Sequence, residues 1–142
     1  MKRLILASIA LVLITSFAKA QEVTDELVWK YALMTEVVDQ MKADLSRVVN
    51  ETIQKQEGMT GQRYNELAGG ATAANEFETK FMASIKKIKD RRLKAIKSVN
   101  SNLATKMLGS VDNYNAVKAA VEGDKKAKYD EYKAQIAFGA SS

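Results

Sequence analysis

The sequence of 142 residues contains no cysteine and no histidine, and it also lacks proline. Without cysteine the chain forms no disulfide bond. Without cysteine and histidine together it lacks the ligands of the usual zinc site and of common protein-bound haems, and it lacks the Cys-His and Ser-His-Asp systems of many hydrolases. Most familiar hydrolytic and redox mechanisms are therefore excluded. We expect a protein that is not an enzyme and that has no catalytic residues, no cofactor and no metal site.

Nucleotide-binding and calcium-binding signatures are missing as well, because the sequence contains no P-loop, no Gly-rich dinucleotide fingerprint and no EF-hand loop. Three carboxylates remain as candidates for acid/base or metal chemistry: Glu36, Asp39 and Asp44. Glycosidase chemistry needs two carboxylates that face each other across a cleft. We expect Glu36 and Asp39 to lie off the apolar face of their helix, in water.

The first twenty residues have the anatomy of a secretory signal peptide. Lysine and arginine follow the initial methionine, residues 4–17 form an apolar run, and residues 18–20 give the small-x-small pattern of a cleavage site. A transmembrane helix needs about 20 apolar residues, and this run is shorter. We predict a signal peptide at residues 1–20 and one mature domain at residues 21–142 with no transmembrane anchor. The protein would then be exported, either to the periplasm or into the medium.

Removal of the predicted signal peptide changes the charge of the chain. The full sequence has 22 basic and 17 acidic residues, a formal net charge of +5. Three basic residues and no acidic residue lie in residues 1–20, so 19 basic and 17 acidic residues remain, a net charge of +2. This near balance disfavours nucleic acid as a partner.

A long amphipathic helix is predicted over residues 24–57. Its apolar residues recur at alternating steps of four and three, which is typical of a coiled-coil face, and Thr52 continues the series. They are Leu27, Tyr31, Met34, Val38, Met41, Leu45 and Val48. Thr24 is a suitable N-cap, and Gly58 is a natural stop. Such a helix is about 50 Å long, so we expect it to pair lengthwise with another helix.

Residues 75–108 are predicted to form the second long helix, which begins at Asn75 and ends at Gly109. One face carries an apolar series that Arg92 interrupts: Phe77, Phe81, Ile85, Ile88, Ile96, Val99, Leu103 and Met107. A stretch of small residues, 68–74, reads as the connection between the two long helices.

Shorter helices are predicted over residues 60–67 and 110–121, after each long helix, and a C-terminal helix over residues 124–137. No segment alternates convincingly as a strand would. The sequence therefore predicts an all-α fold, a long antiparallel helical hairpin or bundle with a short helix after each long one.

Residues fifty positions apart match weakly along the chain, so that residues 24–67 and 75–121 form two repeat-like units. The matched pairs include Tyr31 with Phe81, Val49-Asn50 with Val99-Asn100, Ile53 with Leu103, Tyr64-Asn65 with Tyr114-Asn115, and Leu67 with Val117. Shared helical periodicity is one explanation. Internal duplication is the other, and it predicts a pseudo-symmetric bundle.

The first unit resembles a bacterial family. The resemblance rests on Thr24-Asp25-Glu26-Leu27, Tyr31-Ala32, Gly58-Met59-Thr60 and Tyr64-Asn65-Glu66-Leu67. These segments are similar to domain-of-unknown-function family 4168, whose members run from an aromatic-Ala helix to a Gly-Leu-Thr and Tyr-Asn-x-Ile ending. The second unit departs from this pattern, since Leu108-Gly109-Ser110 stands in place of Gly-Met-Thr. The resemblance is strongest over residues 24–67 and implies an exported bacterial helical protein; the family has no established activity to transfer.

The strongest local charge signal is a basic run in the second long helix. It contains Lys86, Lys87, Lys89, Arg91, Arg92, Lys94 and Lys97. These residues could bind a polyanion such as nucleic acid or lipopolysaccharide, or an anionic membrane. The alternative is an intramolecular match, because residues 21–57 hold eight acids and four bases whereas residues 76–108 hold three acids and nine bases. Two antiparallel helices of opposite charge would then cover each other's flanks.

The repeated pairs Tyr64-Asn65 and Tyr114-Asn115 are candidate recognition residues, since each offers a ring and an amide. A structural role explains them more simply. Each Tyr would pack its short helix against a long one, and each Asn would make a local hydrogen bond.

A hairpin with short helices cannot shield both long apolar faces, so either the last helices fold back or two chains associate as a homodimer. We expect a non-enzymatic binding or structural component of the cell envelope. The methionines and aromatic residues would also suit a periplasmic chaperone, and the basic run at residues 86–97 would suit a polyanion or membrane-surface binder.

Overall fold

The computed structural model describes residues 22–139, and within them the chain forms five helices and no strand. The helices are α1 (Asp25–Lys55), α2 (Gly61–Ala68), α3 (Glu76–Leu108), α4 (Val111–Glu122) and α5 (Lys126–Gly139). The predicted all-α class is confirmed, and so is the packing of the two long helices against each other. The predicted signal peptide, residues 1–20, lies outside the described residues.

The first four helices begin at capping side chains. At the start of α1, the hydroxyl of Thr24 accepts a hydrogen bond from the amide of Leu27 at 3.3 Å. Thr60, Asn75 and Ser110 accept equivalent bonds at the starts of α2, α3 and α4. α3 ends at Gly109, whose φ of +84° lies in the left-handed region that glycine enters without strain. Local capping therefore fixes where each of these helices starts.

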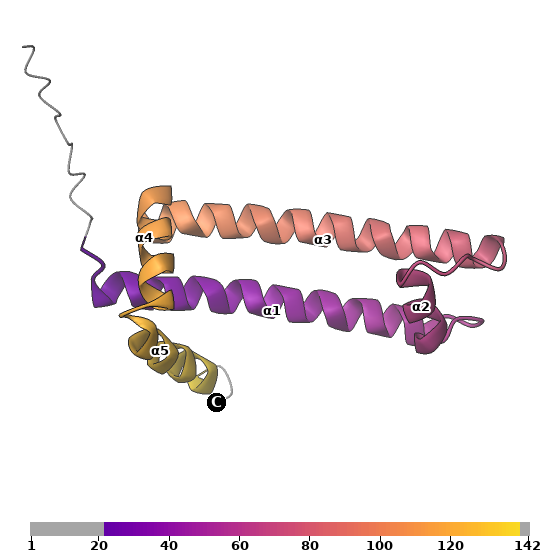
Figure 1. The fold of residues 1–142 in the computed structure, drawn as a ribbon, viewed down its shortest axis with the longest axis horizontal. Helices are drawn as coiled ribbons and strands as arrows, with labels where there is room; N and C mark the ends of the chain where they lie inside the picture. The colour runs from indigo at the N-terminus through magenta and orange to yellow at the C-terminus, as the bar shows by residue number, and fades with distance from the viewer. Residues whose placement is uncertain (1–21, 140–142) are drawn as a thin grey trace, which may run out of the picture.

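The two long helices lie side by side and run in opposite directions (Figure 1). α2 crosses one end of this pair and α4 crosses the other end, so each short helix closes one end of the hairpin. Each short helix contacts both long helices. The order long, short, long, short thus produces a hairpin with two closed corners.

The last helix, α5, folds back onto the side of α1 that faces away from α3 (Figure 1). The hydroxyls of Tyr129 and Thr35 lie 3.0 Å apart, and the rings of Tyr132 and Trp29 pack edge to face at 5.0 Å between centroids. Folding back, one of the two ways of covering the long helices, is therefore present. Association into a homodimer stays a prediction.

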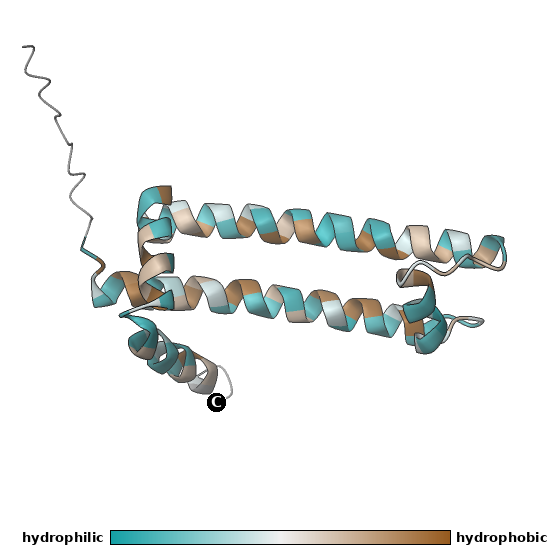
Figure 2. Cartoon of the chain, in the orientation of Figure 1, coloured by the Kyte–Doolittle hydropathy of each residue, from teal (hydrophilic) through white to brown (hydrophobic). Residues whose placement is uncertain are grey.

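Apolar residues gather where α1 and α3 face each other, and much of the outward surface of α3 is hydrophilic (Figure 2). Two clusters of buried side chains divide this seam. The cluster at the α2 end includes Leu45, Val49, Ile53, Tyr64, Leu67, Phe81 and Ile85. The cluster at the α4 end includes Val28, Tyr31, Met34, Ala104, Leu108, Val117 and Val121.

The apolar face of α1 differs from the predicted one in its last turns. The alternation of four and three predicted that Val48 and Thr52 continue the face, but the structure buries Val49 and Ile53 instead. The step after Leu45 is therefore four and then four again. An α-helix has 3.6 residues per turn, so a strict coiled-coil period drifts around a straight helix, and a step of four restores the contact.

Residues fifty positions apart occupy corresponding places at opposite ends of the hairpin. Ile53, Tyr64, Leu67 and Phe81 lie together at the α2 end. Their counterparts Leu103, Tyr114, Val117 and Tyr31 lie together at the α4 end. Each cluster thus takes an aromatic residue from the long helix of the other unit.

Burial predicts which apolar residues of α3 carry stability. Ile85 is 1% exposed and Leu93 is 51% exposed. We expect Ile85→Ala to lower the free energy of unfolding by about 2–5 kcal/mol, because it removes buried methyl groups and leaves a cavity. Leu93→Ala should change it by less than about 1 kcal/mol. Urea unfolding of both variants measures the difference, and equal losses would contradict this packing.

Candidate functional site

Three of the seven predicted cations have partners within the chain. The ammonium of Lys89 donates to the hydroxyl of Tyr64 at 2.7 Å. The guanidinium of Arg92 reaches Asp44 on α1 at 3.1 Å. Lys86 pairs with Asp90, one turn further along α3, at 2.6 Å. These three cations therefore serve contacts inside the fold.

The other four cations, Lys87, Arg91, Lys94 and Lys97, are exposed and have no acidic partner among residues 22–139. Lys87, Arg91 and Lys94 follow one another at steps of four and three, so they lie along one side of α3. They line a shallow depression over Ala83. We call these three residues the outer basic face. Lys86 and Asp90, which pair with each other, line the same depression, and Asp90 is the only acid in the sequence between Glu78 and Asp112.

The predicted charge match between α1 and α3 is wrong for most of these residues. Of the ion pairs formed by the basic run, Arg92–Asp44 is the one that crosses to α1 within the described chain. Two acids of α1 pair with α5 instead, since Lys133 contacts Glu36 at 2.5 Å and Asp39 at 3.2 Å, while Glu51 pairs with Arg47 within α1. The physical reason is direction, because Glu36 and Asp39 lie toward α5 whereas the outer basic face lies on the far side of α3.

Glu36 is consequently not in open water, as the sequence analysis expected. It is partly buried, and the hydrogen bond from Lys133 lowers the pKa of its carboxyl. Glu36 and Asp39 both contact Lys133 of α5, and among residues 22–139 no group of three or more acids, Cys or His could hold a metal ion.

The two repeated Tyr-Asn pairs do not form one site, since they lie at opposite ends of the hairpin. Tyr64 is buried, and the ammonium of Lys89 also lies 5.4 Å from the centre of its ring. Tyr114 is half-buried, with its ring centroid 5.7 Å from that of Tyr31. Burial raises the pKa of Tyr31, and its neighbours Tyr114 and Tyr129 add to this effect. Both tyrosines pack their short helix against a long helix.

The amides of these pairs do not behave as expected. The side chains of Asn65 and Asn115 are exposed and form no hydrogen bond with another residue of the described chain. A different asparagine, Asn113, makes a local hydrogen bond of the kind expected of Asn115. Its side-chain amide donates to the carbonyl of Leu108 at 2.6 Å. Asn113 satisfies a carbonyl at the end of α3 while α4 begins, a role that its place near Gly109 and Ser110 could have indicated.

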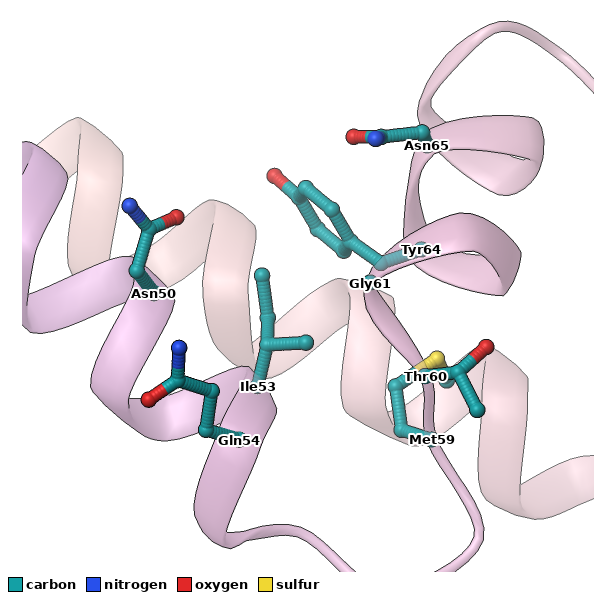
Figure 3. Close-up of a pocket in the computed structure, with 8 residues that line it drawn as sticks. All are labelled: Asn50, Ile53, Gln54, Met59, Thr60, Gly61, Tyr64 and Asn65. Carbon is teal, nitrogen blue, oxygen red and sulfur yellow. The ribbon is translucent and has the colours of Figure 1, made fainter.

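A hollow lies where α1 meets α2, and we call it the α2-end hollow (Figure 3). Asn50 and Gln54 of α1 border it on one side, and Tyr64 and Asn65 of α2 border it on the other, with Ile53 between them. No charged side chain lines it. Its lining offers a ligand the side-chain amides of Asn50, Gln54 and Asn65 and the aromatic ring of Tyr64.

A second hollow, the α4-end hollow, lies between α1, α3 and α4. Its lining includes Tyr31, Val38, Ile96, Lys97, Asn100 and Tyr114. It brings together two residues that the sequence singled out for different reasons, Lys97 of the basic run and Tyr114 of the repeated pair.

An ion pair that was not predicted from the sequence lies at the corner between α2 and α3. The guanidinium of Arg63 contacts both carboxylate oxygens of Glu78, at 2.8 and 2.7 Å, and the backbone amide of Ala74 donates to the same carboxylate at 2.6 Å. Glu78 is 7% exposed. The Arg63 hydrogen bonds and the Ala74 amide lower the pKa of Glu78 to about 2. The spacing Asn75-x-x-Glu78 is that of a capping box and could have singled out Glu78.

Comparisons with protein-family models, with curated proteins and with solved structures found no match for this chain. The resemblance to family 4168 stays a prediction. Within residues 22–139, none of the helices combines the length and hydropathy needed to cross a membrane.

The lowered pKa of Glu78 predicts a pH-dependent contribution to stability. Its ordinary value is 4.5 and its folded value is about 2, so the contribution is complete above 4.5 and is lost as the pH falls toward 2. At pH 7 we expect Glu78→Gln to lower the melting temperature by about 5 °C or more, since it leaves Arg63 without its charged partner. This difference from the unaltered protein should shrink as the pH falls from 4.5 to 2.

Glu76→Gln is the matched control for thermal melting at each pH. Glu76 lies in the same turn and forms an exposed ion pair with Lys80. Such pairs contribute little, so this variant should melt close to the unaltered protein at pH 7. Equal effects of the two variants would contradict a special role for Glu78.

Proposed function

We propose that this chain is an exported, non-enzymatic binding component of the bacterial cell envelope, and that the outer basic face of α3 binds an anionic lipid surface. The observation that carries the proposal is the set of exposed cations Lys87, Arg91 and Lys94, which lie along one side of a straight helix without acidic partners. Their line suits a planar array of anionic headgroups. Ala83 and the ion pair of Lys86 with Asp90 also line the depression, and no large apolar side chain does, so the contact is electrostatic and involves no apolar insertion.

The pattern of residues 1–20 and the resemblance of residues 24–67 to family 4168 support the exported bacterial setting. The fifty-residue correspondence supports an origin by internal duplication.

A chaperone is the weaker candidate. The large apolar side chains that are exposed in the described chain lie on three helices and are Val37, Phe77, Leu93 and Val111. A chaperone cradle needs a continuous apolar surface, and single exposed apolar residues are normal on any protein. The unpartnered cations therefore favour the anionic surface.

Export predicts a cleaved chain. We expect the protein expressed from the full sequence to be recovered outside the cytoplasm with Gln21 as its first residue, which N-terminal sequencing of the purified product reads directly. Recovery in the cytoplasm with Met1 intact would contradict the exported setting while leaving the binding surface to be tested separately.

Binding to lipid predicts a specific loss on neutralising the outer basic face. Sedimentation with vesicles of phosphatidylglycerol and phosphatidylcholine measures it. We expect the triple variant Lys87→Gln, Arg91→Gln, Lys94→Gln to bind about 100-fold more weakly, since each cation near an anionic surface contributes about 1 kcal/mol. Binding of the unaltered protein should weaken with added salt and vanish on phosphatidylcholine alone.

The matched control removes three exposed cations that lie elsewhere, Lys55, Lys106 and Lys118, which also lack acidic partners among the described residues. Both triple variants have the same net charge. The control should lose less than about threefold in affinity. Equal losses would mean that net charge alone drives binding, and binding to heparin but not to vesicles would point to a soluble polyanion instead.

A further inference from the structure

We propose that the α4-end hollow binds a small amphipathic anion, with a flat apolar body that packs on Tyr31 and Tyr114 and a carboxylate that meets Lys97. This site is separate from the outer basic face. It uses the one unpartnered cation of the basic run that does not line the depression over Ala83.

The hollow has the shape and lining of a small-ligand site. Its volume is about 330 Å³, at the lower end of the range for such sites. Val38 and Ile96 are buried beneath it, and Leu93 stands half-exposed at its edge. The rings of Tyr31 and Tyr114, tilted by 53°, form one wall. An aromatic ring is the body that such a wall accepts best, because ring pairs gain more than their buried area alone provides.

The polar groups of the hollow favour a negative charge. Lys97 has no acidic partner and the amide of Asn100 forms no hydrogen bond within residues 22–139. The acid in the lining, Asp39, is already engaged by Lys133 at 3.2 Å and by Lys42 at 3.6 Å. A ligand carboxylate would therefore find one free ammonium and one free amide donor.

The opposite end of the hairpin shows how the chain treats the equivalent tyrosine. There Lys89 reaches the hydroxyl of Tyr64 and lies over its ring. The residue fifty positions before Lys89 is Asp39, which turns toward α5 and leaves Tyr114 without a charged partner from α1. A lysine therefore contacts the tyrosine at the α2 end, whereas at the α4 end the half-buried Tyr114 packs against the ring of Tyr31, and the two ends differ in their capacity for a ligand.

Three naphthalene derivatives of similar size test the proposal by isothermal titration calorimetry on the purified protein: naphthoate, naphthalenemethanol and naphthylmethylammonium. We expect naphthoate to bind with one molecule per chain and about tenfold more tightly than the neutral alcohol, and the ammonium compound to bind most weakly. Equal affinities, no binding of naphthoate, or tighter binding of the ammonium compound would overturn the proposal.

Lys97→Gln should remove the preference for naphthoate over the alcohol, whereas the matched variant Lys94→Gln, which removes the same charge from the outer basic face, should keep it. Both residues are exposed, so neither change is expected to disturb folding. Asn100→Phe should fill the hollow and weaken all three probes, with circular dichroism melting to verify its fold. A loss of preference in Lys94→Gln as large as that in Lys97→Gln would overturn the site.

Vesicle binding separates this inference from the proposed function. Lys97→Gln should bind vesicles nearly as well as the unaltered protein, and the triple variant of the outer basic face should still bind naphthoate. Each proposal therefore stands or fails by its own measurement.

Discussion

The apolar seam between α1 and α3 is the contact on which the rest of the structure depends. Two helices of 31 and 33 residues bury side chains along their shared length, and neither is surrounded by a globular core. A seam of this kind leaves both ends of the hairpin and the outer sides of both helices open. The other three helices cover parts of this open surface: α2 and α4 close the ends of the hairpin, and α5 covers the outer side of α1.

Residues fifty positions apart build the two ends of the hairpin, but different kinds of interaction close each end. At the α2 end, Arg63 joins α2 to the first turn of α3 through Glu78, and Lys89 reaches Tyr64. The position fifty residues before Glu78 is Val28, a fully buried apolar residue. One corner is thus held by a charged network and the other by apolar and aromatic packing. The hollows at the two ends differ accordingly: Lys97 lines the α4-end hollow, whereas no charged side chain lines the α2-end hollow.

Local signals in the sequence predicted the elements well, because the caps and stops that end each helix are local. Thr24 and Asn75 cap α1 and α3 as predicted, although α1 ends at Lys55, before the predicted stop at Gly58. The sequence could not tell which side of each helix faces a neighbour, because that depends on contacts between distant segments. The shift from Val48 to Val49, the pairing of Glu36 with Lys133, and the meeting of Lys97 and Tyr114 in one hollow all follow from how the helices pack. The sequence showed the basic run, but it could not show which of its cations contact another residue of the fold and which do not.

The charge distribution follows from the same packing. Complementary charge on two long helices neutralises only where the charged sides lie along the seam, and here one pair, Arg92 with Asp44, meets that condition. Lys133 of α5 pairs with Glu36 and Asp39, and Lys125, which precedes α5, pairs with Asp25, so these three acids of α1 are not available to α3. The cations on the far side of α3 therefore form no ion pair with an acid of α1 in the described chain, and only water and dissolved salt screen them from that side. Residues 22–139 hold 19 basic and 17 acidic residues, yet the outward side of α3 is basic, because both the composition of α3 and the direction of its side chains concentrate positive charge there.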